Sequence, residues 1–329
     1  MTHIPLIDMQ RYYRGDAAER ADLAREVDAA CLDTGFFKVA GHKVPDALVQ
    51  ELLAAAHGVF ALPIEREMAV TAPTGTMLRG YLPLHTHRLA RSRGVGTPPD
   101  LCAIFSLARP ALEPGRSVVD PEATQPVIWP EEPADFSTVY SGYYYLIDGL
   151  AADLMKLFAV ALGLPESYFA DKIDDSFAAL NTFGYPAQSD ATKDGQLRAG
   201  THSDFGGLTI LLQQPDAGGL EVMGKDGAWH FLPPQPGRFV INIGDLMAQC
   251  TNHRWCSTPH RVVNPSVNVM TKQSRLSVGF FCHPNFEAMA ECIPTCRDEG
   301  GGSKYAPVKA GTYMRRKIMA VCTPSAALA

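Results

Sequence analysis

The sequence contains no long apolar run and no long run of cationic residues, and these two absences exclude large classes of function. Nowhere in the 329 residues do about 18 apolar residues follow one another, the minimum for a helix that spans a bilayer. The net charge is −6, and no more than three lysines or arginines follow one another. We therefore expect neither nucleic acid nor a membrane as a partner, and a small molecule as the ligand.

The sequence also lacks the motifs of secretion and of common cysteine chemistry. The first residues do not combine a basic segment, an apolar segment and a cleavage site, so we expect a cytoplasmic protein. None of the eight cysteines stands in a CxxC pair, which disfavours a zinc site or a redox motif. Even Cys292 and Cys296, the closest candidates, are expected to be reduced thiols.

The first half of the chain predicts helices. Apolar periodicity predicts a helix from about Ala21, a strand at Phe36–Val39 and a second helix that starts near Pro45. Residues 71–129 are rich in proline, glycine and serine and predict an irregular region with short strands. A stripe of apolar residues predicts one long helix over Phe136–Leu162, whose tyrosines we expect to pack on a sheet.

The second half of the chain predicts strands. After Phe177, short β-branched and aromatic runs alternate with glycine, proline and aspartate, without long helices between them. This order favours an antiparallel sandwich, jelly roll or barrel over a parallel sheet. The predicted fold class is mainly β with flanking helices. We expect a helix-rich region at 1–135, a catalytic core at 136–285 and an extension at 286–329, packed as one integrated domain.

A candidate metal site begins in the stretch GTHSDFGGLTILLQ, residues 200–213. In an extended segment His202 and Asp204 project from the same face, although such a short motif also occurs by chance. A later strand block, STPHRVVNP, adds His260, and antiparallel sandwiches bring distant strand ends together. Two imidazoles and one carboxylate on one face of an octahedral ion leave three positions open, as in non-haem iron(II) oxygenases. Zinc prefers a tighter tetrahedral set.

A candidate carboxylate receptor follows in the stretch SRLSVGFF. Arg275 and Ser277 share one face of a predicted strand, and a guanidinium with a neighbouring hydroxyl binds carboxylates well. A buried arginine without a partner would be costly. The pair therefore predicts an acidic small molecule inside the β-structure.

Four stretches resemble the 2-oxoglutarate and iron(II)-dependent dioxygenases, in the branch that includes isopenicillin N synthase. They are CLDTGFFKVAGHKV, LMKLFAVALGLPESYF, GTHSDFGGLTILLQQPDAGGLEV, and PGRFVINIGDLMAQCTNHRWCSTPHRVVNP with the following SRLSVGFF. The resemblance extends over residues 4–285 and implies a double-stranded β-helix, or jelly-roll, core. It implies iron(II) bound by His202, Asp204 and His260.

The resemblance also implies a co-substrate site and a reaction. Arg275 and Ser277 would hold the distal carboxylate of 2-oxoglutarate. Tyr185 would add a hydrogen bond to the co-substrate or the substrate, and the alternative is a buried structural tyrosine. The implied reaction uses O2 and couples oxidative decarboxylation of 2-oxoglutarate to hydroxylation, desaturation or ring rearrangement of a small metabolite. The sequence departs from the family at AGHKV, TFGYP and LCAIFSLARP, in regions expected to face the substrate, so the substrate is not implied.

Three alternatives stay open at the level of sequence. An oxidase of the isopenicillin N synthase type would use no 2-oxoglutarate, and Arg275 and Ser277 would then bind the carboxylate of the substrate itself. A non-catalytic β-sandwich would only bind a ligand. A cupin-like enzyme is disfavoured, because cupin sites usually use more histidines and a glutamate.

Other polar residues have less specific expectations. Asn242 and Asp245 are expected to shape the sheet and its turns. Three further pairs are expected in structural or loop positions, or at the rim of the pocket: Asn252 with His253, His85 with His87, and His283 with Glu287.

Overall fold

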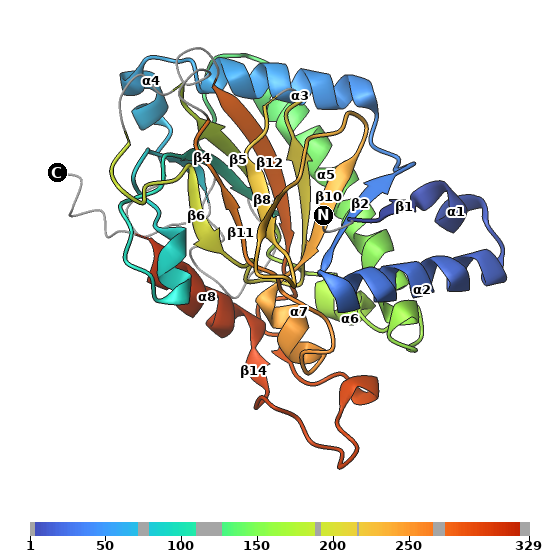
Figure 1. The fold of residues 1–329 in the computed structure, drawn as a ribbon. Coiled ribbons are helices and arrows are strands. Elements are labelled where there is room, and N and C mark those ends of the chain that lie inside the picture. Colours follow the sequence, from blue (N-terminus) through green and yellow to red (C-terminus); the bar gives the residue numbers. More distant parts are fainter. Residues whose placement is uncertain are drawn as a thin grey trace.

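Two antiparallel sheets pack face to face in the computed structural model, which describes residues 4–71, 79–109, 127–187, 192–215, 217–265 and 274–322. The larger sheet has eight strands, in the order β1 (Leu6–Asp8), β2 (Phe36–Ala40), β10 (Phe239–Ile243), β7 (Leu208–Gln213), β12 (Arg275–Cys282), β5 (Ala179–Tyr185), β4 (Ala103–Ala108) and β3 (Gly80–Leu82). The smaller sheet has the order β6 (Ala199–His202), β11 (His260–Val262), β8 (Leu220–Met223) and β9 (Trp229–Phe231). Figure 1 shows both sheets with their flanking helices.

The strand pairing confirms the predicted fold class and jelly-roll core. Neighbouring strands of both sheets run antiparallel, except that β1 pairs with β2 in parallel. A cluster of apolar side chains from both sheets fills the space between them, including Tyr185, Leu220 and Val262. This arrangement leaves the ends of strands from distant parts of the sequence next to one another.

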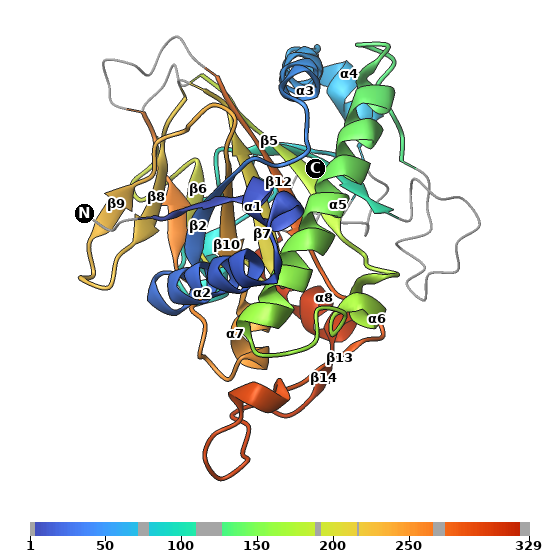
Figure 2. The same cartoon turned by 90° about the vertical axis from the view of Figure 1, so that its right-hand side faces the viewer.

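Helices, above all α2, α3 and α5, cover the outer face of the larger sheet. Figure 2 shows the smaller sheet, the larger sheet and the long helix α5 as successive layers. The helices are α1 (Met9–Arg14), α2 (Ala17–Asp33), α3 (Asp46–Val59), α4 (Ile64–Ala69), α5 (Phe136–Ala161), α6 (Ala170–Ile173), α7 (Asp245–Cys250) and α8 (Ala310–Val321), with the 3-10 helices η1 (Leu89–Arg93) and η4 (Pro294–Cys296). A short two-stranded sheet joins β13 (Met289–Ala290) to β14 (Val308–Lys309).

The predicted helices are confirmed, with one difference at the start of α2. That helix begins at Ala17 rather than near Ala21, because Asp16 caps it. The Asp16 carboxylate accepts hydrogen bonds from the backbone N–H groups of Ala18 and Glu19, and the Glu19 side chain accepts from the Asp16 N–H. Such a capping box satisfies the free donors of a first turn and extends the helix beyond its apolar stripe.

The tyrosines of α5 pack on the larger sheet, as predicted. The Tyr140 hydroxyl donates toward the backbone carbonyls of Phe105 and Leu180, at 3.1 and 3.2 Å, and the Tyr144 hydroxyl donates to Ala178 O at 3.0 Å. Both rings are fully buried. They combine a large apolar contact with satisfied polar tips, and they hold the helix at a fixed position along β4 and β5.

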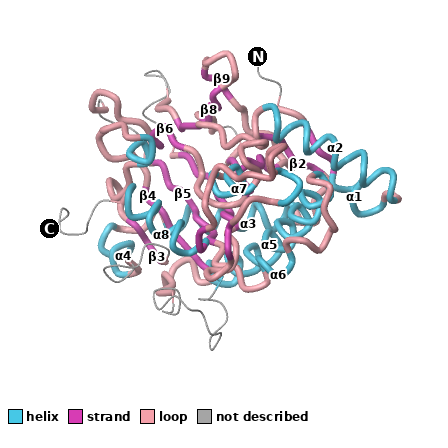
Figure 3. Tube along the Cα trace, turned by 90° about the horizontal axis from the view of Figure 1, so that it is seen from below, coloured by secondary structure: helices cyan, strands magenta, loops and turns pink. Residues whose placement is uncertain are grey.

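The region expected to be irregular, residues 71–129, and the C-terminal extension both contribute to one end of the β-structure. The region 71–129 contains β3, η1 and β4, while its residues 72–78 and 110–126 lie outside the described part. The extension after residue 285 contains α8, whose residues Met314, Ile318 and Val321 line the cavity between the sheets. Seen from below, α8 lies across the strand ends near β4 and β5 (Figure 3).

Gly35, which follows α2, is a position that we expect to tolerate no side chain. Its φ is +68°, and a Cβ atom there would lie 1.9 Å from the backbone oxygen of Cys256. We expect Gly35→Ala to lower the free energy of unfolding by about 2–5 kcal/mol, from backbone strain and overlap together. Denaturant unfolding measures this loss.

A matched control is available at Gly163, which follows α5. Its φ is +71°, but a Cβ there meets nothing within 4 Å. Gly163→Ala should therefore cost only the backbone term, about 1–3 kcal/mol. Equal losses in the two variants would show that the contact with Cys256 does not matter.

Candidate active site

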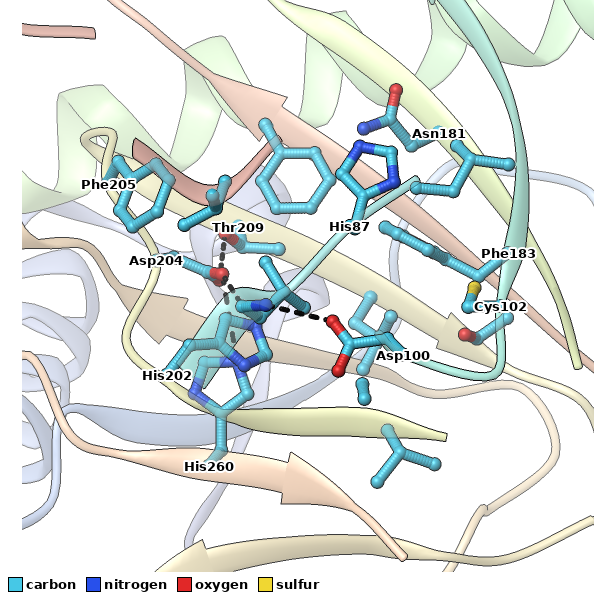
Figure 4. A pocket seen from close by; sticks show the side chains of 18 of the residues that line it. His87, Asp100, Cys102, Asn181, Phe183, His202, Asp204, Phe205, Thr209 and His260 are labelled. Atoms are coloured by element: carbon cyan, nitrogen blue, oxygen red, sulfur yellow. Dashed lines mark hydrogen bonds and ion pairs between the residues drawn. The ribbon is translucent and has the colours of Figure 1, made fainter. Parts of the chain in front are cut away.

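The register of the smaller sheet brings two histidines together. His202 is the last residue of β6 and His260 the first of β11, and the two are directly paired across the strands. Their ring centroids lie 4.4 Å apart. The Nε2 atoms of His202 and His260 lie 3.8 and 3.6 Å from Oδ1 of Asp204. Figure 4 shows the three side chains gathered on one wall of the cavity.

Backbone hydrogen bonds fix which nitrogen of each histidine faces Asp204. His202 Nδ1 donates to Gly200 O at 2.7 Å, and His260 Nδ1 donates to Thr258 O at 3.2 Å. With the hydrogen on Nδ1, each neutral ring presents the lone pair of Nε2 toward Asp204. Hydrogen bonds of this kind set the tautomer and the orientation of histidines that bind metals.

The second oxygen of Asp204 is held by two side chains that the sequence did not single out for this role. Oδ2 accepts hydrogen bonds from Thr209 Oγ1 at 2.5 Å and from Asn242 Nδ2 at 2.6 Å. Oδ1 remains directed at the two imidazoles. Asn242 lies in β10, as expected of a residue that shapes the sheet, but its amide also orients Asp204.

The electrostatics of this group suit a divalent cation. Burial opposes the charged form of Asp204, yet His260, His202 and the Asn242 amide together hold the pKa of this carboxyl well below its usual range. Burial and the neighbouring His260 lower the pKa of His202 to about 4. Burial also disfavours the charged form of His260, but Asp204 outweighs it and raises the pKa of His260 above its ordinary value. A bound cation would replace the proton that this histidine and Asp204 attract.

The three side chains fit an iron(II) site with open positions. Their candidate ligand atoms all lie within 4.8 Å of one another, and this is the one such group of three or more in the described ranges. Two nitrogens and one carboxylate oxygen are the donor set of non-haem iron(II) oxygenases. A closed structural zinc site would need a fourth protein ligand.

Arg275 forms the floor of the same cavity. Its side chain is 1% exposed, Nε donates to Ala217 O at 2.9 Å, and Nη1 lies 3.3 Å from Ser277 Oγ. Nη2 is buried without a hydrogen-bond partner among the described residues. Tyr185 is paired with Arg275 across β5 and β12, and its ring centroid lies 4.8 Å from the guanidinium carbon. A buried guanidinium with a free donor favours an anionic partner, and the geometry of a carboxylate suits it.

One cavity of about 160 Å³ is lined both by Arg275 and by His202, Asp204 and His260, which we call the metal group. Strand β12 connects them, because Arg275, Ser277 and Phe281 lie at alternate positions and so share its inner face. Phe281 pairs with Thr209, the residue that holds Asp204, so the metal group lies further along the strand than Arg275. A ligand that is acidic at one end can thus reach from Arg275 toward the metal group.

The remaining polar residues divide between the cavity wall and the surface. His283 and His87 line the cavity, and His85 is exposed. Asn252 and His253 are structural: Asn252 Oδ1 accepts from Lys304 N, and His253 contacts Tyr305. The prediction for Glu287 at the pocket rim is wrong, because its side chain forms an exposed ion pair with Lys309.

Comparison with known families agrees with this geometry. The profile of the 2OG-Fe(II) oxygenase superfamily matches residues 175–284, and the profile of the non-haem dioxygenase in morphine synthesis N-terminal region matches residues 4–132. The chain is 31% identical over 322 residues to the 2-oxoglutarate-Fe(II) type oxidoreductase hxnY of Emericella nidulans, covering 94% of this chain and 88% of the relative. The chain belongs to the 2-oxoglutarate and iron(II)-dependent oxygenase superfamily.

A second relative and a solved structure support the same family for this oxygenase. It is 31% identical to the validamycin A dioxygenase of Streptomyces hygroscopicus subsp. limoneus, over 97% of this chain and 87% of that one. The crystal structure of a full-length Neurospora crassa protein in complex with alpha-KG superimposes with a TM-score of 0.85, at 26% identity and 96% coverage of both chains. The double-stranded β-helix implied by the sequence is confirmed.

The oxygenase therefore uses iron(II), 2-oxoglutarate and O2, and couples oxidative decarboxylation of 2-oxoglutarate to oxidation of a small molecule. Both alternatives, an oxidase without 2-oxoglutarate and a non-catalytic sandwich, lack support among these relatives. No helix in the described ranges has the length and apolarity needed to cross a membrane.

We expect the two side chains that hold Asp204 to govern metal affinity. Asn242→Ala and Thr209→Val each free Oδ2 to rotate, and each should weaken iron(II) binding about 10- to 100-fold. An anaerobic iron titration measures the effect. The control is Thr182 in β5, whose buried hydroxyl donates to the Tyr140 hydroxyl. Thr182→Val removes this hydroxyl and should leave iron affinity unchanged. If Thr182→Val weakens iron binding as much as Thr209→Val does, the effect of Thr209 is one of general stability.

Proposed function

We propose that His202, Asp204 and His260 bind the catalytic iron(II) of this oxygenase. The observation that carries this assignment is the convergence of Nε2 of both histidines and Oδ1 of Asp204, while hydrogen bonds occupy the other polar atom of each side chain. A site with this preorganisation binds a cation without rearranging its ligands.

We assign the distal carboxylate of 2-oxoglutarate to Arg275 and Ser277. The free Nη2 of Arg275 and the neighbouring Ser277 hydroxyl supply the donors. Tyr185 packs its ring under the guanidinium and completes the wall of this site. The Tyr185 hydroxyl is assigned to the hydrogen bond with the co-substrate, because it lies beside Ser277 and Arg275.

His202, Asp204 and His260 would hold iron(II), and Arg275 and Ser277 would hold 2-oxoglutarate; together the two groups would supply O2 activation, with two of the electrons from oxidative decarboxylation of the co-substrate. The protein fixes the geometry: Asp204 contributes the negative charge, and Thr209 and Asn242 hold its orientation. Apolar side chains from β12 and α8, such as Phe281 and Ile318, exclude water around the reacting centre. The substrate then lies between the metal group and α8, where hydroxylation, desaturation or ring rearrangement takes place.

The substrate is a small molecule enclosed by this cavity. The similar Neurospora crassa protein has been crystallised with thymine, and another relative is named for validamycin A, so the family fold serves unlike substrates. We also propose that the helix-rich region 1–135, the core 136–285 and the extension 286–329 form one integrated domain, because α2 packs on α5 and α8 closes the cavity. A cytoplasmic location suits its eight free thiols.

An anaerobic titration with iron(II) and 2-oxoglutarate tests the proposal. We expect 2-oxoglutarate to bind the iron-loaded protein tightly, and succinate to form after oxygen is admitted with a substrate. Equal amounts of succinate and oxidised product support the coupled reaction. Turnover without succinate would establish an oxidase instead, and full function in His202→Ala and Asp204→Ala would establish a ligand-binding protein.

A further inference from the structure

His87 presents a hydrogen-bond acceptor to the cavity. The Thr86 hydroxyl donates its one hydrogen to Pro83 O at 2.7 Å, so at 2.9 Å it accepts from His87 Nδ1. The hydrogen of a neutral ring is then on Nδ1, and Nε2 carries a lone pair. Burial lowers the pKa of His87 to about 4, so the ring is neutral at physiological pH.

Asn181 presents a donor to the same cavity. Its Oδ1 accepts a hydrogen bond from Ser106 Oγ at 2.7 Å, across the paired strands β4 and β5. This bond fixes the orientation of the amide. No acceptor among the described residues bonds Nδ2, which is left with its two hydrogens. In Figure 4 the Asn181 amide and the His87 ring point into the same part of the cavity.

Neither the His87 ring nor the Asn181 amide bonds a charged side chain in the described part of the chain, because their partners are the hydroxyls of Thr86 and Ser106. Of the charged residues that line the cavity, Asp204 belongs to the metal group, and Arg198 and Arg275 lie near the buried thiol of Cys102. Asp100 donates its backbone N–H to His87 O, while its carboxylate accepts from the N–H groups of Leu89 and Gly200. An ionised substrate group placed beside His87 and Asn181 would be desolvated without compensation.

Aromatic rings lie on both sides of Asn181 along the sheet: Phe183 is paired with Ser277, toward Arg275, and Phe281 is paired with Thr209, toward the metal group. Phe183 is two residues from Asn181 on the inner face of β5, and Phe281 faces it edge to face, with ring centroids 6.2 Å apart. Phe281 pairs with Thr209, which holds Asp204. Ring faces and edges of this kind favour a flat ligand over a flexible chain.

We propose that the substrate is an uncharged ring compound with an amide edge, whose carbonyl accepts from Asn181 Nδ2 and whose N–H donates to His87 Nε2. Lactams, pyridones and pyrimidinediones belong to this class. The inference rests on the proposed function, because the substrate would be oxidised at the metal group of the same cavity. The residues proposed to recognise the substrate, His87 and Asn181, are separate from those assigned to iron and 2-oxoglutarate.

Calorimetric titration of the anaerobic iron(II) and 2-oxoglutarate complex tests the proposal. The probes are thymine, uracil, 2-pyridone and δ-valerolactam, compared with toluene, which lacks the amide edge, and with orotate, which adds a carboxylate to uracil. We expect at least one amide probe to bind ten times more tightly than toluene and orotate. Failure of all four amide probes to bind, or equal or tighter binding of orotate or toluene, would overturn it.

Two variants test the assigned residues. Asn181→Asp replaces the donor by an acceptor of nearly the same shape, and His87→Phe keeps a ring but removes the acceptor. Each should weaken binding of the amide probe about 10- to 100-fold, because one polar group is left unpaired. The Kd of 2-oxoglutarate should not change. Unchanged probe binding in Asn181→Asp would overturn the assignment even if His87→Phe fails to fold.

The same titration provides a control variant and distinguishes failure of this inference from failure of the proposed function. His85→Asn alters an exposed histidine two residues from His87, and it should bind the probes like the unaltered protein. If 2-oxoglutarate does not bind, the proposed function fails. The probes are then titrated into the protein alone, where their ranking still decides the class of ligand.

Discussion

Asp204→Ala is expected to reduce 2-oxoglutarate-dependent turnover by about 1000-fold or more. The variant removes the carboxylate that faces both histidines and leaves the Asn242 amide and the Thr209 hydroxyl without their acceptor. Loss of the charge that holds a catalytic metal costs several kcal/mol of barrier. Succinate formation measures turnover and an anaerobic titration measures iron(II) binding. Turnover and iron(II) binding should be lost together.

The matched control for this variant is Asp226→Ala. Asp226 also faces a histidine, with its carboxylate 2.9 Å from His230 Nε2, but it is exposed and outside the cavity. Turnover should stay within about twofold of the unaltered protein, since exposed ion pairs contribute little. If Asp204→Ala folds and keeps more than a tenth of the activity, Asp204 is not an iron ligand.

Arg275→Ala is expected to raise the Kd for 2-oxoglutarate about 30- to 1000-fold while leaving iron(II) affinity unchanged. The substitution removes a guanidinium that is 1% exposed and that still has a free donor. Truncating one partner of a buried charge pair costs about 2–4 kcal/mol. Titration of 2-oxoglutarate into the iron-loaded protein gives its Kd, and a separate iron titration gives the iron(II) affinity.

Two further variants show what the guanidinium contributes. Arg275→Lys keeps the charge but loses the paired donors, so its Kd should fall between those of the unaltered protein and Arg275→Ala. Arg261→Ala removes an arginine that pairs with Glu221 on the smaller sheet, and it should leave the Kd unchanged. Normal 2-oxoglutarate binding with lost substrate binding in Arg275→Ala would instead assign this arginine to the substrate.

The parts of the site that could be predicted from sequence are those set by the period of a strand. His202 and Asp204 are two residues apart, and so are Arg275 and Ser277, and an extended backbone places both members of each pair on one face. His260 needed one further assumption, that distant strand ends of an antiparallel sandwich become neighbours, and the direct pairing of His260 with His202 agrees with it. The long helix α5 followed from its apolar stripe in the same way.

The parts that could not be predicted depend on contacts between distant strands. Asn242 approaches Asp204 because β10 pairs with β7 in a particular register, and no local pattern encodes that register. The acceptor on His87 depends on a chain of hydrogen bonds through Thr86 to Pro83, in a region without periodicity. Glu287 was misplaced because proximity in sequence to His283 does not set the direction of a side chain beyond the end of β12.

Different elements of the fold supply different parts of the cavity wall, and this division has a consequence for evolution. The residues that we assign to iron and to the co-substrate stand on or beside the strands of the two sheets, whereas His87, Met314 and Ile318 come from a loop and from α8. Mutations in these latter segments can change which compound fits without shifting the strand registers on which oxygen activation depends. A lineage can therefore acquire a new substrate by substituting a few residues outside the β-core, while its oxidising chemistry is inherited unchanged.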